Sequence, residues 1–255
     1  MSGGSHPSAM PPGLAAASPD EPLLRVTGLR AAYGAVEVLF GVDLAVQPGE
    51  VLALMGRNGA GKSSLLKAVM GLMPRAGGSV RFDGREILGL APFRICRLGL
   101  GWVPEDRRIF TDLSVAENLA VGRRPPQAGA PAWTEERLLR LFPNLAGMLE
   151  RPAAHMSGGE QQMLTVARTL MGNPRLVLLD EPSEGVAPRI VEQMAATIQA
   201  LKQEGLSVLL SEQNLGFAAA VADRVCVLDR GEVRLQAPMR DLIASPELRR
   251  KLLAV

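Results

Sequence analysis

One stretch decides the fold of this chain: Gly56-Arg57-Asn58-Gly59-Ala60-Gly61-Lys62-Ser63. It follows the apolar run Val51 to Met55, typical of a strand buried on both faces, and precedes Ser63 to Gly71, where apolar residues recur at helical spacing. The stretch matches the pattern G-x-x-x-x-G-K-[ST], and a strand before it and a helix after it are the context that confirms a phosphate-binding loop. We therefore expect nucleotide phosphates to bind where this strand meets this helix.

The residue types of this phosphate loop explain how it would hold an anion. Glycines let backbone N–H groups converge on the phosphates with no Cβ in the way, and the helix N-terminus adds partial positive charge. Lys62 is expected to reach the β- and γ-phosphates, and Ser63 to bind Mg²⁺. The alternative, a flexible glycine turn, would leave the flanking elements unexplained. The predicted nucleotide-binding residues here are Gly56, Arg57, Asn58, Gly59, Ala60, Gly61, Lys62, Ser63 and Ser64.

A pair of carboxylates ends a second apolar strand, Leu176 to Leu179. Asp180 is expected to hold Mg²⁺ through a water, and Glu181 is the candidate base that polarises the attacking water. A lone Asp-Glu before Pro182 would also fit a solvated acidic turn. Together with the phosphate loop, the pair favours cleavage of a phosphoanhydride.

The composition indicates a globular chain with one large core. Hydrophobic residues make up 47% of the 255 residues, which suits one large domain or one and a half. The formal charge is +2, with both signs interspersed, and this pattern does not predict binding to nucleic acid. The longest apolar runs fall far short of the roughly 20 residues that cross a bilayer, so any membrane spans are expected from another chain.

The first 21 residues predict a disordered leader. They are rich in Ser, Gly, Pro and Ala, with no basic start and no apolar segment, unlike a signal peptide. Cys96 and Cys226 lie far apart in no metal-ligand spacing and are expected to be reduced, small apolar residues. Both observations favour a cytosolic chain.

The rest of the chain alternates strand and helix patterns. Leu23 to Val46 and Ser79 to Asp83 have strand character. The later predicted elements are Leu176–Leu179, Pro188–Gln203, Ser207–Ser211, Leu215–Asp223 and Val225–Leu228. Such alternation implies a parallel sheet with helices on both faces. Ligands of these sheets bind at the carboxyl ends of the strands, where Gly56, Asp180 and Gln213 fall.

Two segments depart from this alternation. Residues 91–156 suggest short helices joined by Pro- and Gly-rich loops, with a capping box at Ser114 to Glu117 and a helix opening at Thr134. We expect a helical insertion there, in which Arg123 to Ala132 is a flexible surface loop. Residues 236–255 are expected to form a helical tail capped at Ser245.

The segment Met156-Ser157-Gly158-Gly159-Glu160-Gln161-Gln162 resembles the signature of ABC-type ATPases, which usually begins with Leu. Ser157 and Glu160 also have capping-box spacing, so the segment alone would fit an ordinary helix start. The order and spacing of the other motifs favour the resemblance, which covers about Leu23 to Glu232. A P-loop kinase would need neither this signature nor Glu181.

The resemblance implies an α/β P-loop NTPase domain over residues 22–235, with a mainly parallel sheet, an N-terminal antiparallel β subdomain and the helical insertion. It also implies that two subunits sandwich two ATP molecules with Mg²⁺. The signature of one subunit then faces the γ-phosphate on the other, through Ser157, Gly158, Gly159, Glu160 and Gln161. Tyr33, in Ala32-Tyr33-Gly34, is similar to the family's adenine-stacking aromatic.

Three residues differ from the commonest pattern of that family. Glu105 replaces the usual Gln, Gln213 the usual switch His, and Ala187 the usual Asp. Glu105 can still bind Mg²⁺, so the expected metal ligands are Ser63, Asp180 and Glu105. Gln213 can donate a hydrogen bond to the γ-phosphate but carries no positive charge. The expected catalytic residues are therefore Glu181, Gln213 and Glu105, and Glu181 is expected to contribute most to catalysis.

This combination resembles the shorter ATPase subunit of branched-chain amino acid importers, and also relatives that carry urea, amides or aromatic acids. The resemblance implies a second ATPase subunit, permease subunits, indirect work with a solute-binding protein, and a place on the cytoplasmic face of the inner or plasma membrane. The rival from another class is a non-transport ABC ATPase. Such proteins typically carry coiled coils, zinc-binding cysteines or basic extensions, none of which this sequence contains.

Overall fold

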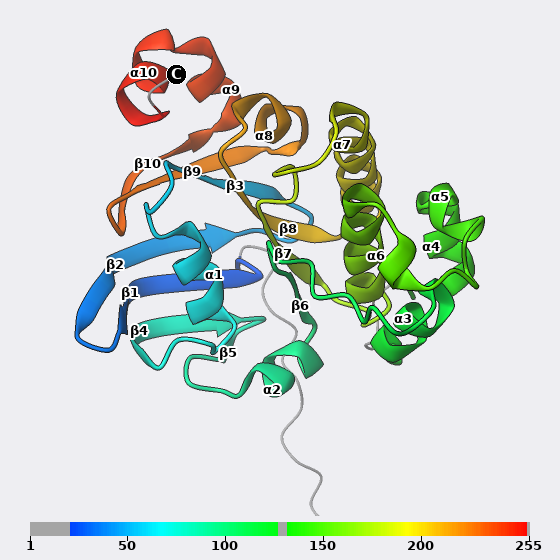
Figure 1. Ribbon diagram of the computed structural model, residues 1–255. Coiled ribbons are helices and arrows are strands. Elements are labelled where there is room, and N and C mark those ends of the chain that lie inside the picture. Colours follow the sequence, from blue (N-terminus) through cyan, green and yellow to red (C-terminus); the bar gives the residue numbers. More distant parts are fainter. Residues whose placement is uncertain (1–20, 127–131, 254–255) are drawn as a thin grey trace, which may run out of the picture.

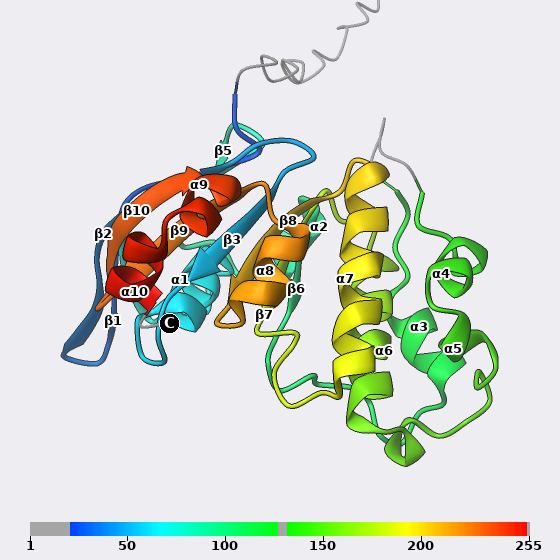
Figure 2. The ribbon, with the colours of Figure 1, turned by 90° about the horizontal axis from the view of Figure 1, so that it is seen from above.

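The computed structural model describes residues 21–126 and 132–253. Figure 1 shows two sheets and a helical side, and Figure 2 shows how they are layered. The smaller sheet comes first, then helix α1 (Lys62–Val69), the larger sheet, and helices α6 (Gly158–Leu170) and α7 (Pro188–Gln203). Helices α3 (Val115–Gly122), α4 (Glu135–Leu141) and α5 (Pro143–Ala146) lie outermost, on the side of α6 and α7 away from the sheets.

The larger sheet carries the strands that end at the predicted site. Its strand order is β10-β9-β3-β8-β7-β6, parallel throughout except for β10. The bounds are β3 (Val51–Met55), β6 (Leu100–Val103), β7 (Leu176–Asp180), β8 (Ser207–Glu212), β9 (Arg224–Asp229) and β10 (Glu232–Pro238). The predicted parallel sheet with helices on both faces is therefore confirmed.

Alternate side chains of this sheet enter two different cores. In β7, Leu176 and Leu178 pack in the cluster that holds α1, while Val177 and Leu179 pack in the cluster that holds α6 and α7. A strand covered on both faces needs no polar positions. That is why β3 and β7 are apolar along nearly their whole length.

The smaller sheet is the predicted antiparallel β subdomain. Its strand order is β2-β1-β4-β5, and the bounds are β1 (Leu24–Tyr33), β2 (Val36–Val46), β4 (Arg75–Phe82) and β5 (Arg85–Glu86). Leu65 and Leu66 of α1 share one core cluster with residues of both sheets. Helix α1 is thereby fixed between the sheets, which fixes the phosphate loop at its N-terminus.

Helices α2 (Pro92–Arg97) and α8 (Leu215–Val221) lie against the larger sheet, whereas α3 to α5 pack outside α6 and α7. A 3₁₀ turn spans Ala153–His155. Helix α3 begins with the predicted capping box, in which Ser114 N donates to Glu117 Oε2 over 2.8 Å. Thr134 caps α4 as predicted. Within residues 21–126 and 132–253, no helix combines the length and apolarity needed to span a membrane.

The expected helical insertion over residues 91–156 is not wholly helical. Leu100–Val103 forms strand β6, which pairs in parallel with β7 at the edge of the larger sheet. A run of four residues has too little periodicity to separate a strand from a short helix. A Cβ on Gly101 would lie 2.8 Å from Thr169 Cγ2, so close packing on α6 explains the glycine inside this strand.

The C-terminal segment also differs from expectation. Strand β10 runs to Pro238, so the expected domain limit at residue 235 falls inside a strand. The tail then forms α9 (Met239–Ala244) and α10 (Pro246–Leu253), and Leu248 N donates to Ser245 Oγ over 3.3 Å as the predicted cap requires. The expected leader, apart from residue 21, and residues 127–131 of the expected surface loop lie outside the described residues.

A core substitution tests this packing. Phe82 on β4 is fully buried in the cluster that joins the two sheets, so Phe82→Ala should lower the free energy of unfolding by about 3 to 5 kcal/mol. Phe93→Ala is the matched control, because Phe93 is 51% exposed and should change it by less than about 0.5 kcal/mol. Urea unfolding followed by circular dichroism measures both. Equal losses for the two variants would contradict the assigned core.

Candidate functional site

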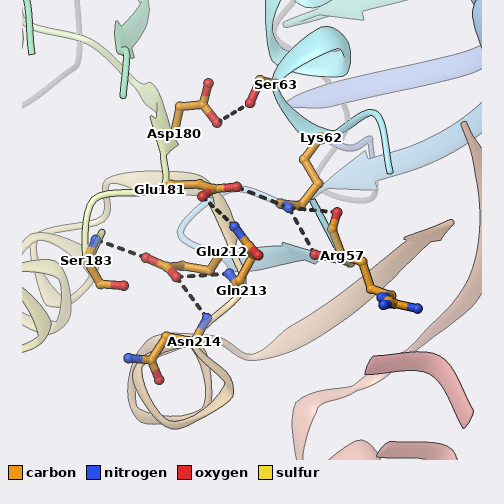
Figure 3. A network of polar contacts seen from close by, with 10 residues as sticks. Arg57, Lys62, Ser63, Asp180, Glu181, Ser183, Glu212, Gln213 and Asn214 are labelled. Carbon is orange, nitrogen blue, oxygen red and sulfur yellow. Dashed lines mark hydrogen bonds and ion pairs between the residues drawn. The ribbon is translucent and has the colours of Figure 1, made fainter. Parts of the chain in front are cut away.

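The site lies at the carboxyl ends of three neighbouring strands. Strand β3 leads into the phosphate loop, β7 ends at Asp180, and β8 ends at Glu212 (Figure 3). Because β8 pairs with both β3 and β7, the three strand ends lie side by side. Residues more than 100 positions apart in the sequence thus meet at one edge of the sheet, as the alternating pattern predicts.

The phosphate loop depends on glycine at its first position. Gly56 has φ +153°, and a Cβ there would lie 2.2 Å from the carbonyl oxygen of Leu228 on β9. Gly61, with φ +107°, is the residue immediately before α1. These positions need glycine because the loop turns sharply and packs against the neighbouring strand without side chains.

Lys62 is buried and hydrogen-bonded inside the loop. Its Nζ donates to the carbonyl oxygen of Gly56 over 2.9 Å and to that of Arg57 over 3.3 Å. The same Nζ lies 3.1 Å from Glu181 Oε1, and the two side chains are 3% and 9% exposed. A buried ammonium is tolerated only with such partners. This ion pair ties the phosphate loop to the end of β7.

Gln213 is a second partner of Glu181. Gln213 Nε2 donates to Glu181 Oε2 over 2.7 Å, so Glu181 accepts from Lys62 on one oxygen and from Gln213 on the other (Figure 3). Glu181 also has φ +47°, a left-handed conformation that is uncommon for a residue with a side chain. Such local strain persists only where surrounding contacts hold it.

Two acidic side chains beside this network had not been singled out from the sequence. Glu212 is 2% exposed, and its carboxylate accepts from the backbone N–H groups of Ser183, Gln213 and Asn214 over 3.0 to 3.1 Å. It therefore joins the loop after β7 to the start of α8. In the sequence, this role of Glu212 was indicated by its position at the end of an apolar strand. Glu184 hydrogen-bonds to Glu181.

The two hydrogen-bonded carboxyls have opposite pKa shifts. Burial acts to raise the pKa of Glu181, but the bond from Glu184, the Lys62 ammonium and Gln213 together lower it below its usual range. The bond to Glu181 and the Glu181 charge raise the pKa of Glu184 to about 7. Below about pH 7 the pair therefore holds one negative charge, on Glu181, and a proton on Glu184.

The predicted metal ligands fit a hard cation. Ser63 Oγ donates to Asp180 Oδ1 over 3.0 Å, which brings hydroxyl and carboxylate together. Burial raises the pKa of Asp180, although the bond from Ser63 opposes the shift, so a cation here would relieve the desolvated carboxylate. Glu105 lines the same cavity as Ser63. Mg²⁺ is commonly bound by one or two carboxylates together with phosphate oxygens, and this oxygen set fits it.

Two cavities flank the phosphate loop. The first, of about 540 Å³, is lined by Val38, Asn58, Gly59, Gly61, Lys62, Ser63, Ser64, Glu105, Glu181 and Glu184. The second, of about 590 Å³, is lined by Gly56, Arg57, Asn58, Gly59, Ala60, Gln213, Asp229, Arg230 and Leu253. The structure thus brings the predicted loop residues together with Glu105, Glu181 and Gln213. Tyr33, 44% exposed at the end of β1, lines neither cavity.

The signature residues form a helix start away from both cavities. Ser157 N donates to Glu160 Oε2 over 2.7 Å and Glu160 N to Ser157 Oγ over 3.4 Å, the capping box that the sequence predicts. Gln161 Nε2 donates to the carbonyl oxygen of Met156. Among the described residues lining either cavity, none comes from Ser157 to Gln161. Ala187 stands at the N-terminus of α7.

The two sheets packed around α1 and the phosphate loop at its N-terminus define a P-loop nucleotide-binding protein. The family model of the ABC transporter matches residues 39–184, more than half of the chain, and the chain belongs to this family of ATP-hydrolysing cassettes.

Individual relatives agree with this assignment. The high-affinity branched-chain amino acid transport ATP-binding protein BraG of Pseudomonas aeruginosa is 42% identical over 217 residues, covering 85% of this chain and 93% of that protein. The probable branched-chain amino acid transport ATP-binding protein LivF of Archaeoglobus fulgidus is 32% identical, covering 87% and 94%. A solved ATP-binding subunit of an ABC transporter superposes with a TM-score of 0.76 at 30% identity, covering 89% and 94%.

The paired carboxyls predict a pH-dependent stability. The pKa of Glu184 is higher in the folded protein than its ordinary 4.5, so its contribution is present below about pH 4.5 and is lost as pH rises through about 7. Glu184→Gln keeps a hydrogen-bond donor toward Glu181 and cannot ionise. We expect its thermal midpoint, relative to wild type, to rise between about pH 5 and about pH 8.5. Differential scanning fluorimetry without nucleotide measures this, and a difference independent of pH would contradict the assignment.

Proposed function

We propose that this chain is the ATP-hydrolysing subunit of an importer for branched-chain amino acids or related solutes. The observation that carries the proposal is the network that joins Lys62 of the phosphate loop to Glu181 and Gln213 at the adjacent strand ends. The similarity to BraG and LivF over most of both chains supports the transport class. The same residues support a mechanism for the ATPase reaction.

Glu181 is the proposed base. Its lowered pKa keeps it ionised at neutral pH, and it lines the first cavity beside the loop that would hold the phosphates. When the phosphates draw Lys62 toward them, Glu181 loses one of the interactions that lower its pKa. The carboxylate then becomes a better proton acceptor for the attacking water, at the moment when the substrate is in place.

Gln213 is proposed to orient this base. Its amide is a neutral donor, and its bond of 2.7 Å holds one carboxylate oxygen of Glu181, leaving the other for the water. Glu212 supports the arrangement by fixing the backbone of Gln213 and Asn214. A neutral residue at this position can assist the reaction by geometry but takes no proton away.

The phosphates and metal would be bound by residues from three segments. Backbone N–H groups of Gly59 to Lys62 would face the phosphates, with Arg57, Asn58 and Ser64 beside them. Ser63, Asp180 and Glu105 would hold Mg²⁺, which neutralises charge on the phosphate oxygens when bound. Tyr33 would stack on adenine, and its exposed ring suits a nucleotide held partly by a second subunit.

The signature would act on a second cassette. Ser157, Gly158, Gly159 and Gln161 lie at the N-terminus of α6, with Glu160 as its cap, so backbone donors and the helix dipole are available to a phosphate from outside the chain. The proposed assembly is a pair of cassettes closing on two ATP molecules. The partner is a second ATPase subunit, identical or different in sequence.

The assembly would sit on the cytoplasmic face of the inner or plasma membrane. The surface from Glu105 to Leu113, together with helices α3 to α5, would receive short helices of the permease subunits, and a solute-binding protein would deliver the solute. The exposed Phe110 ring lies on this surface. Pulldown from membranes separates this proposal from a non-transport ABC ATPase: permease subunits support it, and ribosomes or DNA contradict it.

Substitution of the proposed base tests the mechanism. Glu181→Gln should lower the ATPase kcat at least about 100-fold while the protein still retains ATP, because the amide cannot take the proton from water. Gln213→Ala should lower kcat by about 10-fold or less, since it removes an orienting bond only. The measurements are phosphate release and filter-bound labelled ATP, made on the membrane complex reconstituted in vesicles.

The exposed Glu150→Gln on the helical side is the matched control, with the same change of charge outside the site. It should leave kcat unchanged. Normal hydrolysis by Glu181→Gln would show that another group serves as the base. Uptake of leucine, urea or an aromatic acid into the same vesicles, with the matching binding protein, then separates the solute classes.

A further inference from the structure

The turn that follows Glu105 has an unusual backbone. Arg107 has φ +61° and Arg108 has φ +49°, so two successive residues with large side chains occupy the left-handed region. This conformation favours glycine or asparagine, and two arginines in a row persist there only if other contacts hold them.

The signature helix α6 supplies those contacts. Thr165 Oγ1 donates to the carbonyl oxygen of Arg107 over 2.8 Å, and the guanidinium of Arg168 donates to the carbonyl oxygen of Arg108. Both donors lie on α6, one turn apart. The segment that begins at Glu105 is therefore fastened by its backbone to the helix that carries the signature.

The side chain of Arg107 reaches two further motifs. A Cβ built on Gly158 would lie 2.6 Å from Arg107 Nη1, so the guanidinium packs over this glycine, in the space that a methyl group would take. A Cβ on Gly185, in the loop after β7, would lie 3.9 Å from Arg107 Nη2. The guanidinium is thus packed between the signature and the Ser183–Ala187 loop, both outside its own segment.

The charge of Arg107 has no acidic partner in the parts of the chain that the structure describes. The side chain is half-buried, and within residues 21–126 and 132–253 its guanidinium forms no ion pair or hydrogen bond. The adjacent Arg108 pairs with Asp106 over 2.9 Å. Arg107 is therefore held by packing against Gly158. An arginine with a purely structural role would be expected to pair with a carboxylate.

We propose that Arg107 is a positioning residue that couples the Glu105 segment to the signature, holding Gly158 and the start of α6 where they meet the phosphate on the second cassette. This inference rests on the proposed function, since it concerns the same two-subunit site. A movement of Glu105 on nucleotide binding would pass through the fastened turn to α6. Arg107 acts through Gly158 and not on the substrate of its own subunit.

The test uses a substitution whose effects on stability and activity point in opposite directions. Arg107→Gly suits the left-handed backbone, so the thermal midpoint should stay level or rise, whereas the guanidinium is lost. In the reconstituted membrane complex we expect kcat for ATP hydrolysis to fall about 10-fold or more, with KM for ATP changed less than about twofold. If Arg107 had only a structural role, its loss would lower the thermal midpoint and would not lower kcat while leaving KM nearly unchanged.

Asp83→Gly is the matched control, because Asp83 is also a charged residue with a left-handed backbone, φ +50°, but lies outside the site and the permease-facing surface, and it should leave kcat near the wild-type value. Arg107→Lys keeps a charge without the planar fork and should restore only part of the rate. Wild-type kcat in Arg107→Gly would overturn the proposal while leaving the proposed function intact. A wild-type complex without ATPase activity would instead contradict the proposed function.

A double-mutant cycle tests the contact itself. Gly158→Ala places a methyl group where Arg107 now packs, so it should lower kcat in the wild-type background. In the Arg107→Gly background, the fold-loss of kcat caused by Gly158→Ala should be several times smaller. Independent, multiplicative losses would overturn the packing of Arg107 against the signature. Thermal midpoints of all variants show whether each has folded.

Discussion

The buried ion pair between Lys62 and Glu181 is the interaction on which the rest of the site depends. It joins the first turn of α1 to the end of β7, and both side chains are almost fully removed from water. Charges so placed are costly unless every donor and acceptor is used. The carbonyl oxygens of the phosphate loop, the amide of Gln213 and the carboxyl of Glu184 meet that requirement, and each comes from a different segment.

The two sheets provide the rigidity that this pair needs. Helix α1 is packed between them, which fixes the direction from which Lys62 enters the site. Strand β7 is buried on both faces, which fixes the position of Glu181 at its end. The left-handed backbone of Glu181 is retained because these two elements cannot move apart without exposing their cores. The Lys62–Glu181 pair is therefore held in one geometry by the elements on either side of it.

The signature helix α6 stands outside this site. Its capped N-terminus, with Gly158 packed on Arg107, contributes nothing to the two cavities beside the phosphate loop. A chain with one well-formed half-site and one outward-facing helix terminus suits an enzyme completed by a second subunit. The bonds from Thr165 and Arg168 to the turn after Glu105 give the two halves a physical link.

The sequence by itself determined the phosphate loop, the alternating elements and the helix caps at Ser114 and Ser157, because these follow from local periodicity and hydrogen bonding between near neighbours. Only the tertiary structure decided that β6 is a strand and that Glu212, Glu184 and Arg107 belong beside the site. Strand β6 is too short to show a period, Glu212 bonds to Ser183 and Arg107 packs on Gly158, both far away in the sequence, and Glu184 faces Glu181 in a loop without periodicity. Contacts of that kind exist only once the sheet has brought its strand ends together, since no pattern within one segment encodes its neighbour in space.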